Sequence, residues 1–223
     1  MSFRVFAEIV MIDFDVTKGF VKICGVTSAD DARMVVSSGA DALGLNFAIS
    51  KRHVESETAR DVVEATPGFM HVGVFRDSDS AFVLETVSSS GVNVAQIHGL
   101  LSNDLTERLH ERDIRVIKAL SVNESDFLDF DDGLVDAVLV DGAEPGSGVG
   151  YSRSLVTRRE FRAPLIIAGG LNTNNVASVI DEIGPWGVDV ATGVEASPRV
   201  KDPILVSKFV TLAREAFKRE ENM

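Results

Sequence analysis

Two side chains capable of acid–base chemistry end short apolar runs of the sequence. Cys24, the lone cysteine of the chain, closes a run near the start, and Asp141 closes another much later. A thiol and a carboxyl group that face each other can act as base and acid in proton transfer. Each residue also has a structural interpretation, because a free cysteine often packs as a small hydrophobe and an aspartate often caps a loop. Taken singly, neither residue identifies an active site.

Other polar residues stand at corresponding places, where apolar runs end. Lys22 precedes Cys24 by two positions, so in a strand both would project from one face, and the lysine would favour a thiolate. Arg52 follows the second run, and Gln96 and His98 close the fourth. For His98 the simpler interpretation is a structural side chain whose hydrogen bonds are satisfied within the protein. The remaining candidates, which could surround an anion, are Gly148, Gly169, Gly170, Thr192 and Gly193.

The elements that must position these residues are short apolar runs that alternate with amphipathic segments. Nearly continuous apolar runs suit strands of a parallel sheet that is buried on both faces. Successive runs end about 22 to 28 residues apart, which leaves room for one strand, one helix and their loops. The predicted strands are Val21–Cys24, Ala42–Phe47, His71–Phe75, Val94–Ile97, Val116–Ala119, Ala137–Val140, Leu165–Ala168 and Val188–Ala191.

Helix-start signals follow several of these runs. Ser28 with Asp31 three positions later forms a capping-box pattern. Asn172 is expected to cap the helix after the seventh strand. Asp202 followed by Pro203 predicts the start of the last helix.

Eight strand–helix units in 223 residues predict a single-domain (β/α)8 TIM barrel over residues 21–223, preceded by an N-terminal extension of residues 1–20. An open doubly wound sheet is the alternative. In such barrels the active site lies at the carboxyl ends of the strands, and the loops after strands seven and eight often bind phosphate. Two glycine sites in these loops favour phosphate binding over mere tight turns. A short helix near Val194 is expected to direct its N-terminus at the anion. Within the extension, Val5–Phe14 could form a strand that covers the bottom of the barrel or could be poorly ordered, and the sequence leaves both alternatives open.

Composition narrows the class of partner. The chain carries 34 acidic and 22 basic residues, a formal net charge of −12, which argues against non-specific binding to nucleic acid or an anionic membrane. Both a salt-adapted host and an ordinary acidic cytoplasmic enzyme fit this balance. A lone cysteine forms no internal disulfide, and the start of the chain lacks a signal-peptide pattern, so a cytoplasmic location is expected. No metal-ligand spacing or nucleotide-binding motif stands out, so we expect no metal and no cofactor.

The sequence segments at these strand ends, taken in their order along the chain, resemble those of the phosphoribosylanthranilate isomerases of tryptophan biosynthesis. The similarity runs from about Val21 to the C-terminal helix, and the ordered set is specific although each segment is short. Two departures stand out. The family usually has Ser-Pro-Arg where this chain has Ser50-Lys51-Arg52, and a lysine or similar polar residue where this chain has Val149. The matching segments lie at 22–25, 39–47, 96–99, 138–141, 146–148, 168–172, 187–195 and 201–203.

The resemblance implies an Amadori rearrangement of N-(5-phosphoribosyl)anthranilate. By this similarity Asp141 corresponds to the general acid that protonates the ring oxygen, and Cys24 to the general base that takes the proton from carbon 2. Arg52 corresponds to the residue that binds the anthranilate carboxylate. The phosphate would lie on Gly170, Thr192, Gly193 and their neighbours. The chemistry needs neither metal nor cofactor, and both a monomer and a homodimer are compatible with it.

Two other functions are open. One is a sugar isomerase like those of histidine biosynthesis, but that resemblance would require a carboxylate at position 24 and a half-barrel repeat, and the sequence has neither. The other is a catalytically silent barrel that binds a phosphorylated metabolite. The presence of both Cys24 and Asp141 speaks against it.

Overall fold

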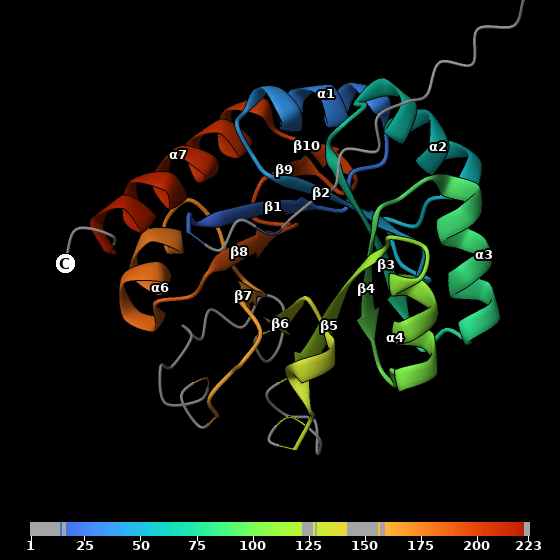
Figure 1. Cartoon of the computed structure of the whole chain (residues 1–223). Coiled ribbons are helices and arrows are strands. Elements are labelled where there is room, and N and C mark those ends of the chain that lie inside the picture. The colour runs from blue at the N-terminus through green and yellow to red at the C-terminus, as the bar shows by residue number, and fades with distance from the viewer. Residues whose placement is uncertain are drawn as a thin grey trace, which may run out of the picture.

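Eight parallel strands close into a barrel in chain order, as the spacing of the apolar runs predicts (Figure 1). The computed structural model describes residues 14, 17–121, 127, 129–141, 156 and 159–220. Strand β1 pairs with both β2 and β8, and the pairing of Lys22 with Asp189 closes the ring. The fold is therefore a (β/α)8 barrel and not an open sheet. The strands are β1 Phe20–Cys24, β2 Ala42–Asn46, β3 Met70–Arg76, β4 Val94–His98, β5 Arg115–Ser121, β6 Ala137–Asp141, β7 Leu165–Ala168 and β8 Gly187–Val190.

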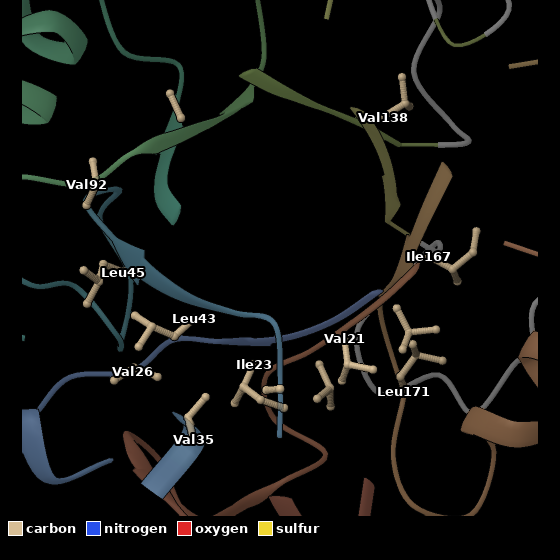
Figure 2. Close-up of a cluster of buried hydrophobic side chains, with 14 of the residues drawn as sticks. Val21, Ile23, Val26, Val35, Leu43, Leu45, Val92, Val138, Ile167 and Leu171 are labelled. Atoms are coloured by element: carbon tan, nitrogen blue, oxygen red, sulfur yellow. The ribbon is translucent and has the colours of Figure 1, made fainter. Parts of the chain in front are cut away.

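Alternate residues of each strand face opposite sides of the barrel wall. In β1, Val21 and Ile23 belong to the outer core between the strands and the helices, whereas Phe20 belongs to the inner core. Figure 2 shows outer-core side chains such as Leu43 and Ile167 arranged around the outside of the ring of strands. This alternation decides which polar side chains of each strand point into the barrel.

The helices lie outside the ring of strands (Figure 1). Ser28 caps α1 by accepting a hydrogen bond from the Asp31 amide, as predicted. Asp202 caps α7 in the same way, by accepting bonds from the amides of Ile204 and Leu205. The described helices are α1 Ala29–Ser37, α2 Ser56–Ala65, α3 Ser80–Ser90, α4 Asn103–His110, α6 Val176–Ile183 and α7 Pro203–Glu220, with a 3-10 turn, η1, at Asp132–Leu134. None of these helices is long and apolar enough to span a membrane.

Two predictions about helix starts are wrong. The residue that precedes α6 is Asn175, and Asn172 instead donates its amide to the Asn175 side chain within the preceding turn. No helix begins near Val194. The chain there forms an antiparallel hairpin of β9 Glu195–Ser197 and β10 Val200–Lys201, because Pro198 lacks an amide donor and Arg199 adopts a φ of 77° in the turn.

Three aromatic rings fill the end of the barrel opposite the carboxyl ends of the strands. Phe14 is buried and meets Phe20 edge-on at 5.8 Å, while Phe20 stacks on Trp186 at 4.6 Å. Phe14 is the one described residue of the segment Val5–Phe14, and the rest of that predicted strand lies outside the described residues. The extension thus contributes at least one side chain to the inner core.

His71 makes the stability of the barrel depend on pH. Burial lowers the pKa of His71 from 6.5 to about 4, and its Nε2 lies 2.8 Å from the Thr66 hydroxyl. Below pH 6.5 the unfolded chain binds a proton that the folded chain refuses, so stability should fall as the pH drops from 6.5 toward 4. We expect this one group to remove roughly 2 to 3 kcal/mol over that range.

Urea unfolding at several pH values measures this loss. His71→Gln, whose amide can still donate to Thr66, should show a flatter dependence than the parent chain. The control is His110→Gln, which removes a far more exposed imidazole. An unchanged slope in His71→Gln would assign the acid sensitivity to other groups.

Candidate active site

Strand β1 presents Lys22 and Cys24 to the barrel interior, at the carboxyl end where the strands terminate. Cys24 packs against the inner core, and Lys22 is fully buried. Gly44 of β2 provides the space beside them, because a methyl group there would lie 2.7 Å from Cys24 Sγ and 3.2 Å from Lys22 Nζ. The two side chains therefore share one face, as strand alternation predicts.

Lys22 forms an ion pair inside the barrel with Asp189 of β8. Lys22 Nζ lies 2.9 Å from Asp189 Oδ1. Burial alone would lower the pKa of Lys22, but Asp189 and Cys24 outweigh burial and leave it raised. The charged ammonium group of Lys22 thus lies close to the thiol of Cys24. Asp189 of the neighbouring strand β8 balances its charge.

The thiol of Cys24 responds to opposing influences. Burial raises its pKa most strongly, Lys22 and Lys201 lower it, and Asp189 raises it, so that the net shift is upward. The lysine acts in the predicted direction, but burial outweighs it and the pKa of the thiol stays above its ordinary value. Any base function of Cys24 must therefore draw on the small deprotonated fraction or on a change when a ligand binds.

Asp141 ends β6 on the inner side of the wall. Ala137 and Leu139 of the same strand lie in the inner core, and Val138 and Val140 lie in the outer core, so Asp141 continues the inward series. Its Oδ1 atom is buried. Cys24 and Asp141 thus occupy the same end of the barrel and the same face of its wall.

Arg52 reaches the barrel mouth from the loop after β2. The Ser50 hydroxyl accepts a hydrogen bond from the Arg52 amide at 3.1 Å, which helps to shape this loop. Arg52 Cδ passes over Gly25, where a methyl group would lie only 2.3 Å away. Its guanidinium group binds both carboxylate oxygens of Glu195, at 2.6 and 2.7 Å, and the hydroxyl of Thr192 at 3.0 Å.

Glu195 and Lys201 are two further residues of this site, and no motif in the sequence predicts a role for either. Lys201 is buried, and its Nζ donates to the Ala191 carbonyl at 3.0 Å and to Glu195 Oε1 at 3.3 Å. Their only sequence signal is membership of the matching segments. Burial lowers the pKa of Lys201, whereas Arg52 and Lys201 together overcome burial to lower the pKa of Glu195.

Gln96 and His98 of β4 also enter the barrel, since Val94 of the same strand lies in the inner core. Gln96 Nε2 lies 2.9 Å from His98 Nε2. Burial, with the nearby charges of Arg76, Lys22 and Lys118, lowers the pKa of His98 to about 3. His98 is therefore neutral near pH 7 and can exchange hydrogen bonds with a ligand without carrying charge.

The loops after β7 and β8 lie side by side, because Asn172 and Gly193 form a parallel bridge. Gly193 allows this approach, since a methyl group there would lie 2.0 Å from the Leu171 carbonyl oxygen. Gly169 and Gly170 both adopt positive φ angles, 89° and 64°. The predicted anion site at Gly148, like Val149 beside it, lies outside the described residues.

Gly44→Ala tests whether the position of Cys24 matters. The added methyl group must displace the thiol or the Lys22 ammonium, and we expect kcat to fall about 100-fold. Gly68→Ala is the control, because an added methyl group there meets nothing within 4 Å, and only the positive φ of Gly68, 76°, opposes the change. That change should cost about 1 kcal/mol of stability and leave kcat intact. Parent-like kcat in Gly44→Ala would show that the thiol tolerates displacement.

Comparison with known proteins gives one consistent result. A family model described as N-(5'-phosphoribosyl)anthranilate (PRA) isomerase matches residues 21–212. The N-(5'-phosphoribosyl)anthranilate isomerase of Thermotoga neapolitana is 41% identical over 203 residues, which cover 87% of this chain and 98% of the relative.

Two solved structures extend the comparison. A phosphoribosyl anthranilate isomerase in complex with reduced 1-(o-carboxyphenylamino)-1-deoxyribulose 5-phosphate is 34% identical, with a TM-score of 0.73 over 88% of this chain and 99% of that one. A structure described as monomers of the dimeric enzyme from Thermotoga maritima is 33% identical, with the same TM-score and the same coverage of both chains.

Proposed function

This chain belongs to the phosphoribosylanthranilate isomerase family, and from that premise we propose that Cys24 and Asp141 are the base and acid of its reaction. The activity is the isomerisation of N-(5'-phosphoribosyl)anthranilate in tryptophan biosynthesis. The observation that carries the assignment of residues is their common location, on the inner face of the wall at the carboxyl end of the barrel. This is the end at which barrels of this class perform chemistry.

The proposed reaction has two proton transfers. Asp141, in its protonated form, gives a proton to the furanose ring oxygen as the bond from that oxygen to carbon 1 breaks, which leaves an iminium group. The Cys24 thiolate then takes the proton from carbon 2, which the iminium acidifies, and the resulting enamine rearranges to the ketone. Lys22 and Lys201 support the thiolate, because both lower the pKa of Cys24.

The other polar residues are proposed to hold the substrate. Arg52 binds the anthranilate carboxylate, for which its planar guanidinium group is suited. The adjacent loops with Gly169, Gly170, Thr192 and Gly193 hold the phosphate through backbone amides. Lys22, Gln96, His98 and Gly148 complete the substrate-binding set.

We also propose the wider setting of this enzyme. Residues 21–223 form the catalytic domain, residues 1–20 are an extension, and the enzyme acts in the cytoplasm on one small phosphorylated substrate. Nucleic acid and membranes are not partners, in keeping with the net charge of −12. A relative is described as dimeric, so a homodimer is a candidate assembly beside the monomer.

The test is a fluorescence assay that follows disappearance of phosphoribosylanthranilate, run at low and at high salt. We expect turnover in the ordinary range of enzymes, on the order of 1 to 1,000 per second. Binding of a product analogue without turnover would instead support a silent barrel. Turnover of the aminoimidazole ribonucleotide substrate of histidine biosynthesis would revive the other sugar isomerase.

A further inference from the structure

Arg52 is held on one side only. Its Nε and Nη2 atoms bind the two carboxylate oxygens of Glu195, and Nη2 also binds the Thr192 hydroxyl. Among the residues that the structure describes, none accepts a hydrogen bond from Nη1. One edge of the guanidinium fork is therefore fixed, and the N–H groups of Nη1 are left for a ligand.

Glu195 is itself held by a buried cation. Lys201 stands opposite Glu195 in the β9–β10 hairpin, and its Nζ lies 3.3 Å from Glu195 Oε1. The hairpin is tied to the loop after β1, because the Thr27 hydroxyl donates to the Arg199 carbonyl at 3.0 Å. The carboxylate that binds Arg52 is thus held in place by the β9–β10 hairpin, which is itself hydrogen-bonded to the loop after β1.

This cluster of Arg52, Glu195 and Lys201 contains two cations and one carboxylate. It retains a single net positive charge, which favours an anionic ligand. If charge alone mattered, neutralising Glu195 would increase the positive charge and tighten the binding of a carboxylate. If orientation matters, the same change would release the guanidinium group and weaken that binding. The direction of the effect separates the two cases.

We propose that Glu195 is a positioning residue that orients Arg52, so that Nη1 meets the ring carboxylate of the substrate. The proposal rests on the proposed function, in which Arg52 binds that carboxylate. Glu195 contacts no reacting atom in this scheme. Lys201 supports this role of Glu195, because its ammonium group balances the charge of the buried carboxylate. The β9–β10 hairpin thus orients Arg52, which belongs to the loop after β2, toward the carboxylate of the substrate.

The test compares two ligands that differ only in the carboxylate. One is reduced 1-(o-carboxyphenylamino)-1-deoxyribulose 5-phosphate, and the other is the corresponding phenylamino compound. The ratio of their dissociation constants, measured by calorimetry, reports the carboxylate contact alone. We expect a preference of roughly 10- to 100-fold for the carboxylate in the parent chain. In Glu195→Gln we expect it to fall to about 3-fold or less, since a neutral amide grips Arg52 poorly.

Two further variants control for charge and folding. Glu195→Gln combined with Lys201→Met restores the single net positive charge and leaves no unpaired ammonium group, and it should lose the preference equally. This double variant decides the matter if the single variant does not fold. Glu55→Gln removes an exposed carboxylate that pairs with His53 in the same loop as Arg52, and it should keep the preference.

Arg52→Ala separates the two proposals. Loss of the preference both in this variant and in the Glu195 variants supports the positioning role. Loss in Arg52→Ala with an unchanged or stronger preference in the Glu195 variants overturns the role of Glu195 and leaves the function of Arg52 standing. A parent-like preference in Arg52→Ala, or none in the parent chain, overturns the carboxylate assignment itself.

Discussion

Replacing Cys24 by alanine is expected to lower kcat by roughly 10²- to 10⁴-fold or more while the barrel stays folded. The change removes the proposed base but leaves the ion pair of Lys22 with Asp189 in place. Progress curves at saturating phosphoribosylanthranilate give kcat, and thermal unfolding checks the fold. Cys24→Ser keeps the shape of the side chain but is a far weaker acid, so it should be similarly impaired. Full activity in either variant would remove Cys24 from the mechanism.

The pH profile of the parent enzyme gives a second view of the same group. Burial raises the pKa of the Cys24 thiol, and the proposed base is the thiolate. A base with a raised pKa gains its active form only as the pH rises, so kcat/KM should increase from neutral toward alkaline pH. A flat profile over that range, with chemistry rate-limiting, would contradict a thiol base.

Asp141→Asn is expected to reduce kcat by a similar factor, roughly 10²- to 10⁴-fold, because an amide has no proton to give to the ring oxygen. Turnover of the same substrate measures the loss. The matched control is Asp136→Asn, which removes a carboxylate just before the same strand, where Asp136 pairs with Arg115 at 2.8 Å. That variant should lose stability and keep its turnover. Equal activity in the two variants would exclude Asp141 as the acid.

The strands were predictable because each depends on a local pattern. A buried parallel strand needs a short apolar run, and the eight runs coincide with β1 to β8 apart from shifts of one or two residues at their ends. Strand alternation likewise placed Lys22 beside Cys24. Both predictions depend on residues only a few positions apart, and over that distance the geometry of a strand is fixed.

The partners of the site residues could not be predicted in this way. Asp189 lies 167 positions from Lys22, and only closure of the barrel brings the two together. Glu195 lies 143 positions from Arg52. The expected helix near Val194 was wrong for a related reason, because the buried pair of Glu195 and Lys201 belongs to a hairpin that local propensity does not reveal.

The burial of lysine has a practical consequence for following this protein in solution. Three of its seven lysines, Lys22, Lys118 and Lys201, are buried, whereas the other four are exposed. An amine-reactive reagent should therefore label Lys18, Lys51, Lys208 and Lys218 rapidly in the native protein. The three protected amines should react only when the barrel opens, and each lies in a different part of it. Mass spectrometry of the labelled peptides would thus report separately on opening at β1, at β5 and at the β9–β10 hairpin.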